Sequence, residues 1–266
     1  MPAFENFVVD TVVAEGVEAR YMRVGSGNKT MLVIPGVSMF RVTDSAPQLA
    51  PAFEIFLKEY TVYLVDVREN IPEGYTLKEM AEDTVKILLA LGLKDIYLYG
   101  ASMGGTVSGY IAGTYPELIK KVLFASSMCK SNAISDATFS EWINLAIQRN
   151  GVSLGKSFAE HVYSEKTCEQ NMQELLYDYD RLSEEDFCRF VRVVQVLNNF
   201  DFTEIISKIR CPCMVLGSYG DRTLGVEAVQ HLALTCGAEL YLYDSTYGHA
   251  VYAESPDFFE RILNFF

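Results

Sequence analysis

The sequence predicts an α/β fold in which a mostly parallel, eight-stranded sheet is flanked by helices and carries an inserted helical cap. Three observations lead to this prediction. Short strand-like runs alternate with longer helical patterns along most of the chain. At about 150 residues per domain, a chain of 266 residues forms one large domain or one domain with an insertion. Residues 129–199 break the alternation with helical patterns only, so we expect residues 1–128 and 200–266 to form the core and 129–199 the cap.

The chain begins with an antiparallel pair of strands, expected at residues 7–13 and 18–24. The turn sequence Gly25-Ser26-Gly27-Asn28 then leads into a third strand at 31–34. Beyond it, helices and strands alternate: a helix at 48–58, a strand at 62–66, a helix at 77–91, a strand at 96–99, a helix at 103–114 and a strand at 121–125. Alternation of this kind is typical of parallel strands whose sheet is covered on both faces.

The predicted cap contains three or four helical patterns. Two of them, at 137–149 and 184–198, place aromatic and aliphatic side chains along one side of the helix. Alternation resumes after the cap with a strand at 213–217, a helix at 226–236, a strand at 239–243 and a final helix at 256–266. These last elements complete the sheet and cover it.

Composition and charge exclude several classes of protein. Hydrophobic residues make up 50% of the chain and charged residues 21%, which excludes disordered and collagen-like chains. The net charge of −13 repels phosphate backbones and anionic lipids, so we expect neither nucleic acid nor a membrane as a partner. No apolar run reaches the roughly 18 residues that span a bilayer, and residues 1–6 lack the basic start of a signal peptide. We therefore expect a cytoplasmic protein.

The six cysteines are too sparse to replace a core, and we interpret them as reduced thiols. Cys211-Pro212-Cys213 is the only close pair, and no second pair or histidine lies nearby in the sequence to complete a zinc site. The pair is better explained as small buried residues at the entrance to a strand, so no metal is expected.

The pattern G-x-S-x-G occurs twice, and the context of each copy decides between them. Gly100-Ala101-Ser102-Met103-Gly104 follows a predicted strand and opens a predicted helix, the setting in which a serine oxygen projects from the top of a sheet. Gly151-Val152-Ser153-Leu154-Gly155 instead follows a helical pattern, where Gly151 is better explained as a helix terminator. We therefore take Ser102, and not Ser153, as the candidate nucleophile.

A serine hydroxyl is a weak nucleophile and needs a base within hydrogen-bond reach. Of the three histidines, His161 and His231 fall in helical patterns, where a surface or packing role is expected. His249 lies in a loop after the last predicted strand and follows Gly248, which permits an unusual backbone conformation there. His249 is the candidate general base, and its alternative role is a structural loop histidine.

The base in turn needs a carboxylate that orients it. Asp221 comes directly after the strand at 213–217, at the edge of the sheet where His249 is expected. Asp244 is too close to His249 along its own strand, and Asp201 lies where the cap rejoins the core. Asp221 is the candidate, with capping of the following helix as its alternative role.

Backbone N–H groups are needed where negative charge develops on the substrate oxygen. Met103, which follows the nucleophile, supplies one, and Val37 after the third strand supplies the other, with Gly36 allowing close approach. Pro35 has no N–H to donate. An apolar substrate pocket is predicted from a further set of side chains, for each of which plain core packing is an alternative: Met39, Phe40, Met103, Trp142 and Tyr247.

The order Ser102, Asp221, His249, the turn at 100–105 and the helical insertion after the sixth strand resemble the α/β-hydrolase superfamily of serine hydrolases with a lid domain. The resemblance covers nearly the whole chain. It implies hydrolysis of a small acyl compound, such as a carboxylic ester, through an acyl-serine, without a metal or organic cofactor. Because the nucleophile is a serine, the dehalogenase and epoxide-hydrolase branches, whose nucleophile is an aspartate, are disfavoured.

The sequence also departs from the family pattern. Many relatives carry His-Gly where this chain has Pro35-Gly36, and the loop at 66–70 lacks the glycine-rich ending that is common among them. Arg68 in that loop is most simply explained as an ion-pair partner, with Asp83 on the next helix as the candidate.

Other functions of the same fold stay open: a thioesterase, a carbon-carbon bond hydrolase or an aminopeptidase. A further alternative is a small-molecule-binding protein in which the triad of Ser102, His249 and Asp221 is idle. An aminopeptidase would need acidic cap residues to hold an ammonium group. The cap offers four, although such charges usually mark a solvated face: Glu141, Glu160, Glu165 and Glu169.

Overall fold

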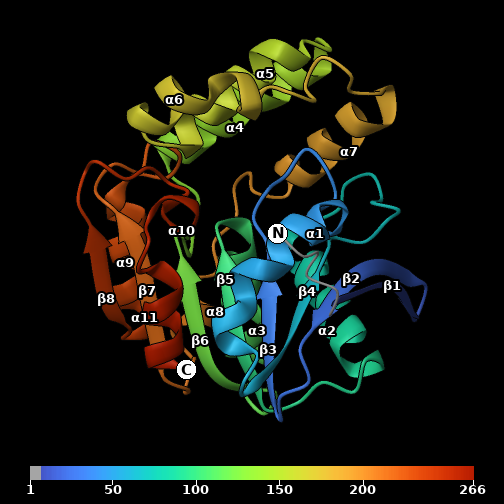
Figure 1. Cartoon of the computed structure of the whole chain (residues 1–266), viewed down its shortest axis with the longest axis vertical. Helices are drawn as coiled ribbons and strands as arrows, with labels where there is room; N and C mark the ends of the chain where they lie inside the picture. Colours follow the sequence, from blue (N-terminus) through green and yellow to red (C-terminus); the bar gives the residue numbers. More distant parts are fainter. Residues whose placement is uncertain (1–6) are drawn as a thin grey trace.

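The computed structural model describes residues 7–266, which fold around one eight-stranded sheet (Figure 1). The strand order is β1-β2-β4-β3-β5-β6-β7-β8. Only the pairs β1-β2 and β2-β4 are antiparallel, and the other five are parallel. The strands are β1 (Phe7–Ala14), β2 (Val17–Val24), β3 (Lys29–Ile34), β4 (Tyr60–Val65), β5 (Ile96–Ala101), β6 (Ile119–Ala125), β7 (Cys213–Ser218) and β8 (Glu239–Tyr243). The predicted sheet is confirmed, while the expectation about residues 1–6 lies outside the described residues.

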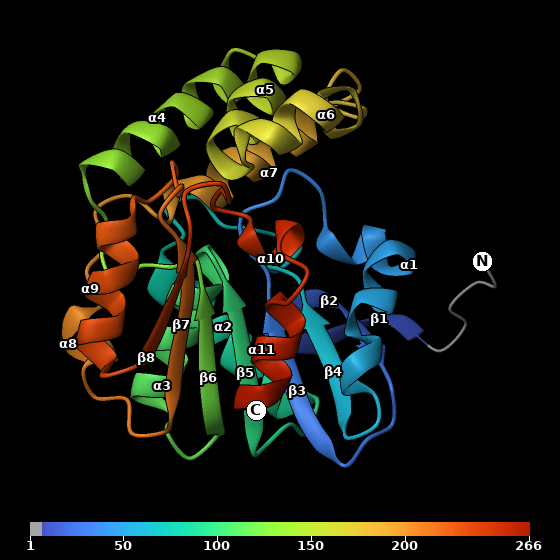
Figure 2. The same ribbon diagram turned by 60° about the vertical axis from the view of Figure 1, so that its left-hand side comes forward.

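Helices cover both faces of the sheet (Figure 2). One face is covered by α2 (Leu77–Ala90), α3 (Met103–Thr114), α8 (Thr203–Ile206) and α9 (Val226–Cys236), and the other by α1 (Ala46–Leu49) and α11 (Phe258–Phe265). Because neighbouring side chains of a strand point to opposite faces, each strand contributes to two hydrophobic clusters. In β3, Leu32 packs into the cluster under α2 and α3, whereas Met31 and Val33 pack into the cluster under α11.

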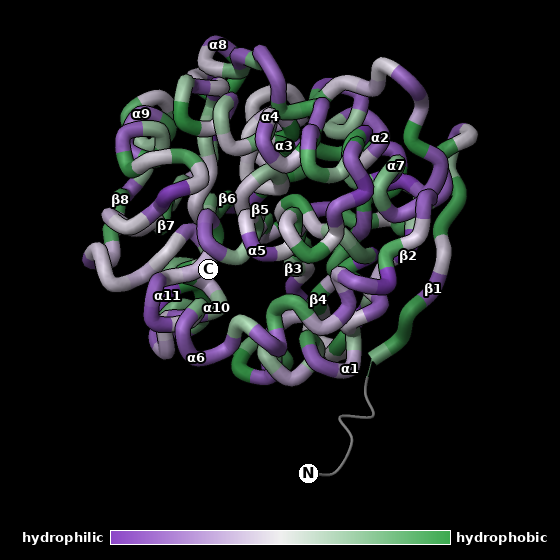
Figure 3. The backbone as a smooth tube through the Cα atoms, turned by 90° about the horizontal axis from the view of Figure 1, so that it is seen from above, coloured by the Kyte–Doolittle hydropathy of each residue, from purple (hydrophilic) through white to green (hydrophobic). Residues whose placement is uncertain are grey.

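Of the five helices between β6 and β7, the first four lie over one end of the strands: α4 (Ala133–Ile147), α5 (Gly151–Val162), α6 (Glu165–Leu175) and α7 (Glu184–Gln195) (Figures 1 and 3). Each begins at a residue whose side-chain oxygen accepts backbone N–H groups of the first turn, the preferred chemistry of a helix start. These residues are Asn132, Asn150, Ser164 and Ser183.

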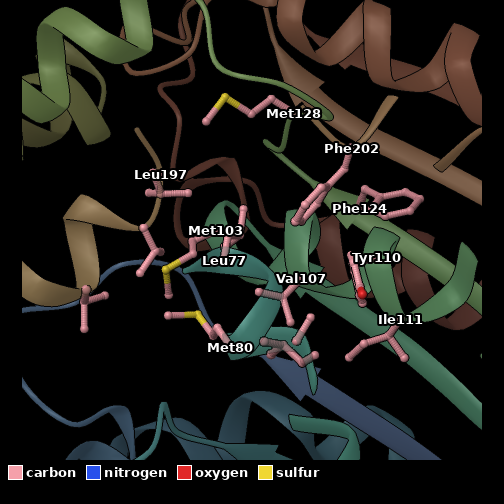
Figure 4. Close-up of a cluster of buried hydrophobic side chains, with 14 of the residues drawn as sticks. Leu77, Met80, Met103, Val107, Tyr110, Ile111, Phe124, Met128, Leu197 and Phe202 are labelled. Atoms are coloured by element: carbon pink, nitrogen blue, oxygen red, sulfur yellow. The ribbon is translucent and has the colours of Figure 1, made fainter. Parts of the chain in front are cut away.

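The cap helices share a hydrophobic cluster with the core. Trp142 of α4 and Phe190 of α7 belong to the same cluster as Val107 of α3. Leu197 and Phe202, on the segment that returns from the cap, pack beside the residues of α3 (Figure 4). The division of the chain at 128 and 199 stays a prediction.

The expected helix at 48–58 is wrong as a regular α-helix. The chain forms the short helix α1 and then a 3₁₀ segment, Ala50–Phe56. Pro51 has no N–H to donate to the carbonyl of Pro47 four residues earlier, so a continuous α-helical ladder cannot form across this segment.

The role predicted for Gly151 is also wrong. Helix α4 ends at Ile147, and it is Arg149 that takes up a left-handed backbone, with φ of 57°. Gly151 begins α5 instead, and a Cβ atom there would lie 2.0 Å from the carbonyl oxygen of Tyr179. A glycine is therefore required at this position by close approach of the backbone. The last helix, expected at 256–266, is α11 at Phe258–Phe265, and a further short helix that the sequence did not predict, α10 (Val251–Glu254), precedes it.

The predicted ion pair between Arg68 and Asp83 is confirmed, with Nη1 2.7 Å from Oδ2. The same nearly buried carboxylate accepts hydrogen bonds from the Tyr75 hydroxyl at 2.9 Å and from the Lys86 ammonium at 2.9 Å. Burial alone would raise the pKa of Asp83, but the hydrogen bonds from Lys86, Tyr75 and Arg68 outweigh it and hold the pKa below its ordinary value.

Replacing Asp83 tests this network. Because its pKa is lowered by folding, Asp83 stabilises the protein above the pKa of the unfolded chain, about 3.9, and this contribution is lost as the pH falls through the folded value. We expect Asp83→Asn to lower the free energy of unfolding by about 3 kcal/mol at pH 7, with a smaller difference near pH 3. Urea unfolding at both pH values measures this.

The matched control is Asp95→Asn, which breaks the exposed pair of Asp95 with Lys120 and should cost less than about 1 kcal/mol. A difference between Asp83→Asn and the unchanged protein that stays constant from pH 7 to pH 3 would contradict the assigned ionisation.

Candidate active site

Ser102 occupies a sharp turn between the end of β5 and the start of α3. Its backbone has φ of 51° and ψ of −121°, a left-handed conformation that residues other than glycine rarely adopt. The glycines beside it let the turn pack closely: a Cβ atom at Gly104 would lie 2.0 Å from the carbonyl oxygen of Ile34, and one at Gly100 2.5 Å from that of Gly104. Strand, strained turn and helix therefore present the Ser102 hydroxyl at the end of the sheet that faces the cap.

Two hydrogen bonds from the neighbouring strand β6 and its loop hold this turn. The Ser102 N–H donates to the carbonyl of Ala125 at 2.8 Å, and the Ser127 hydroxyl donates to the carbonyl of Ser102 at 2.8 Å. No role was predicted for Ser127 from the sequence. A signal for it exists, since Ser127 lies in the loop two residues after the end of β6, at the same edge of the sheet as Ser102.

His249 lies in the loop between β8 and α10 and is 2% exposed. Its Nε2 is 2.9 Å from the Ser102 Oγ, and its Nδ1 is 2.8 Å from Asp221 Oδ2. A carboxylate can only accept, so Nδ1 carries the proton of the neutral imidazole and Nε2 is free to accept the Ser102 O–H. This is the tautomer that a base for Ser102 needs.

Asp221 follows β7, and its side chain is fully buried. Besides the imidazole, its carboxylate accepts the backbone N–H groups of Thr223 and Leu224, both at 2.9 Å. One carboxylate oxygen therefore holds the turn and the other contacts the imidazole. The expected capping of the following helix is wrong, because α9 begins only at Val226 and receives no side-chain cap hydrogen bond. The two backbone bonds hold the carboxylate in the position from which it contacts His249.

The structure brings together Ser102, His249 and Asp221, and places the other candidates in different surroundings. His161 Nδ1 bonds the carbonyl of Ser157 within α5, and His231 Nδ1 lies 3.7 Å from the Cys129 sulfur. The carboxylates of Asp244 and Asp201 each accept the N–H two residues further along the chain. Ser153 lies in the first turn of α5, where its N–H donates to Asn150 Oδ1.

The two residues predicted to bind the substrate oxygen flank Ser102. A Cβ atom at Gly36 would lie 2.9 Å from the Ser102 Cβ, so the backbone leading into Val37 passes directly beside the serine. Met103 is the first residue of α3, and its N–H has no partner within that helix. Among the hydrogen bonds of residues 7–266, none uses the Val37 N–H. Both N–H groups thus fit the predicted role.

The side chains predicted to line a substrate pocket have mixed surroundings. Met39 and Trp142 are buried in the hydrophobic cluster, with the Trp142 ring 4.7 Å from that of Phe158. Phe40 is half-buried and meets Tyr179 of the cap edge-on, at 6.2 Å between ring centroids. Tyr247 packs against Tyr243 at 5.4 Å. Packing accounts for these contacts, and the pocket assignment stays a prediction.

The four cap glutamates considered as ligands for an ammonium group are all exposed, as expected for a solvated face. Within residues 7–266, no three His, Cys, Asp or Glu side chains gather in a way that could hold a metal ion. In the same part of the chain, no helix combines the length and apolar character needed to cross a membrane.

The pKa of the Tyr252 phenol on α10 is influenced by Asp221. Burial raises this pKa, and Tyr163 and the negative charges of Asp221 and Glu254 add to the rise. The phenol is therefore un-ionised at neutral pH.

Residues 34–256 match the family of the alpha/beta hydrolase fold, and the chain belongs to that family.

Two relatives by sequence illustrate the range within the family. The chain is 27% identical over 251 residues to the "Putative carbamate hydrolase RutD" of Rhizobium rhizogenes, which covers 89% of this chain and 92% of that protein. It is 31% identical over 121 residues to "Serine hydrolase BPHL" of Mus musculus, but this match spans only 42% of the chain and 40% of the mouse protein.

Two solved structures share the fold closely. An alpha/beta hydrolase enzyme from a Medee basin deep-sea metagenome library superposes with a TM-score of 0.86 at 19% identity, covering 96% of each chain. The enol-lactonase of Burkholderia xenovorans superposes with a TM-score of 0.82 at 17% identity, covering 96% of this chain and 99% of that one. At such low identity the likeness concerns the fold alone.

Proposed function

We propose that this protein is a serine hydrolase that cleaves carboxylic esters or related acyl compounds through an acyl-serine intermediate. One observation carries the proposal: the continuous chain of contacts from Ser102 Oγ through the His249 ring to Asp221, with spacings of 2.9 and 2.8 Å. Membership of the alpha/beta hydrolase family supports it.

In the proposed acylation step, Ser102 Oγ attacks the carbonyl carbon of the substrate while His249 Nε2 takes the hydroxyl proton. The tetrahedral intermediate then collapses, the bond to the leaving group breaks, and His249 returns the proton to that group. Asp221 stabilises the positive imidazole that exists between these two transfers. Its burial strengthens this effect because little water screens the pair.

The negative charge that develops on the substrate oxygen needs donors in place beforehand. The N–H groups of Val37 and Met103 are proposed for this role, because both lie next to Ser102 and are held by the backbone of the core. In measured cases, one such donor contributes about 10²- to 10³-fold in rate.

Deacylation repeats the chemistry with water. His249 takes a proton from a water molecule as its oxygen attacks the acyl carbon, and the bond to Ser102 Oγ breaks when the proton returns to the serine. The products are the carboxylic acid and the free enzyme. All proton transfers in this scheme are made by side chains of the chain itself.

A second candidate reaction is the hydrolysis of carbamates. It is favoured by the relative named a putative carbamate hydrolase, which matches 89% of the chain. A carbamate carbonyl can be attacked by the same serine, with an amine or alcohol as the leaving group. The same catalytic groups would serve both reactions, so the side chains that line the substrate pocket would select between an ester and a carbamate.

Fluorophosphonate labelling tests the nucleophile, because such reagents bond covalently to activated serines. We expect stoichiometric labelling of the intact protein on the peptide that contains Ser102, detected by mass spectrometry, and none in Ser102→Ala. Ser153→Ala, which removes the serine of the second motif, should be labelled like the unchanged protein. A folded, unlabelled protein would support a binding function with an idle triad.

Replacing Asp221 tests the base. In Asp221→Asn the side-chain amide no longer holds the Nδ1 proton, so the imidazole can adopt the wrong tautomer, and kcat should fall by about 10⁴-fold. Asp244→Asn, on the loop that leads to His249 but with an exposed carboxylate, should change kcat less than twofold. Similar kcat values for the two variants in steady-state assays would remove Asp221 from the mechanism.

A substrate panel distinguishes the reaction classes. We expect esters of short and medium acyl chains to give the highest kcat/KM among matched esters, carbamates, thioesters, aminoacyl amides and diketones, with all turnover lost in Ser102→Ala. Turnover confined to one of the other classes would overturn the ester assignment while leaving the serine mechanism in place. A cytoplasmic location and a small-molecule acyl substrate remain predictions of the sequence.

A further inference from the structure

The turn that joins α5 to α6 in the cap contacts the two loops that carry Asp221 and His249. On the Asp221 side, Thr223 Oγ1 donates to the carbonyl of His161 at 3.0 Å, and Arg222 Nη2 donates to that of Tyr163 at 2.7 Å. On the His249 side, the Ala250 N–H donates to the carbonyl of Val162 at 2.7 Å. Residues 161–164 therefore act as a common support for the two loops.

Glu254, the last residue of α10, completes this support with a half-buried carboxylate. Its Oε2 accepts the Gly248 N–H at 2.7 Å. Its Oε1 accepts the Ser164 N–H at 2.8 Å and the Thr167 hydroxyl at 2.5 Å. One carboxylate thus binds the loop of His249 with one oxygen and the cap with the other, through charge-assisted hydrogen bonds, the stronger kind.

The loop and the cap turn are in direct backbone contact at this point. A Cβ atom at Gly248 would lie 2.6 Å from the carbonyl carbon of Tyr163 and 2.7 Å from the nitrogen of Ser164. No side chain separates the two segments, so a shift of one is transmitted to the other. The residues on both sides of His249 are held by hydrogen bonds: the Gly248 N–H donates to Glu254, and the Ala250 N–H donates to the carbonyl of Val162.

We propose that Glu254 is a positioning residue for His249: its carboxylate couples the cap turn to the histidine loop and so maintains the contact between Nε2 and Ser102 Oγ. This inference rests on the proposed hydrolase function. Glu254 does not touch the reacting atoms in this scheme. Its effect arises because a displacement of about 1 Å at a catalytic group can reduce a rate by 10²-fold.

Glu254→Gln is the primary test, since it keeps the shape of the side chain but removes the charge and replaces one acceptor oxygen with a donor. The amide can accept from the Gly248 side or from the cap side, but not from both. We expect the second-order rate of fluorophosphonate labelling at Ser102 to fall at least tenfold. In steady-state assays kcat should fall by a similar factor, with KM changed less than twofold.

Glu260→Gln is the matched control, because Glu260 is an exposed glutamate on the neighbouring helix α11. It should react like the unchanged protein. The melting temperature of each variant is measured in parallel. If Glu254→Gln lowers the melting temperature but leaves kcat and the labelling rate unchanged, Glu254 is only structural and the proposal is overturned.

Thr167→Val provides a second test if Glu254→Gln fails to fold. It removes the Thr167 hydroxyl, which donates to Glu254 and accepts from the Ser164 hydroxyl, and leaves the bond between Glu254 and Gly248 untouched. We expect a two- to threefold loss in labelling rate at a melting temperature near that of the unchanged protein. An unchanged rate in this variant would contradict the coupling between cap and histidine loop.

Failure of the inference and failure of the proposed function have different signatures. If the unchanged protein does not react with the fluorophosphonate, the serine hydrolase function fails. If it reacts at Ser102 and the Glu254 and Thr167 variants react equally fast, the function stands and only the role of Glu254 is refuted.

Discussion

The left-handed backbone at Ser102 is the constraint on which the arrangement of the site depends. A residue held at φ of 51° costs of order 1–3 kcal/mol, and such a conformation persists only when its surroundings determine it. Here the surroundings are the hydrogen bond that the Ser102 N–H donates to Ala125, the hydrogen bond that the Ser102 carbonyl accepts from Ser127, and the close packing of Gly104 against the end of β3. The same packing brings the loop with Val37 beside the serine. The positions of Ser102 and of the N–H groups proposed to bind the substrate oxygen are therefore consequences of one tight turn.

The cap is bound to the core on both sides of this site. On the side of β4, Arg189 and Arg192 of α7 donate to the carbonyls of Val67 and Ile71, at 3.3 and 3.0 Å. On the side of β7 and β8, the turn at 161–164 bonds the loops of Asp221 and His249. Since cap and core also share one hydrophobic cluster, the cap is an integral part of the fold. It contributes to the geometry of the triad as well as covering it.

The sequence was most informative where local chemistry and tertiary contacts point to the same structure. The strands on both sides of the cap, the turn at Ser102 and the loop histidine His249 were all visible, because alternation, glycine spacing and loop position are local signals. The expected helix at 48–58 is wrong because Pro51 has no N–H to donate to the carbonyl of Pro47, which interrupts a continuous α-helical ladder. Gly151 was misassigned because its reason for being glycine is the carbonyl of Tyr179, which is distant in sequence.

The sequence by itself determined the order of the strands and of most helices, and it indicated the serine proposed as nucleophile and the short list of residues proposed as its partners, since each depends on residues within one element or its adjoining loop. Only the tertiary structure decided that the Ser102 oxygen and the His249 ring, 147 residues apart, come within 2.9 Å, and that the carboxylate of Asp221, the acid expected from the sequence, lies 2.8 Å from that ring. It alone revealed Ser127 and Glu254, whose hydrogen-bond partners lie on other elements. The physical reason is that such contacts depend on how the parallel strands pair and how the cap packs across them, and no local pattern encodes either.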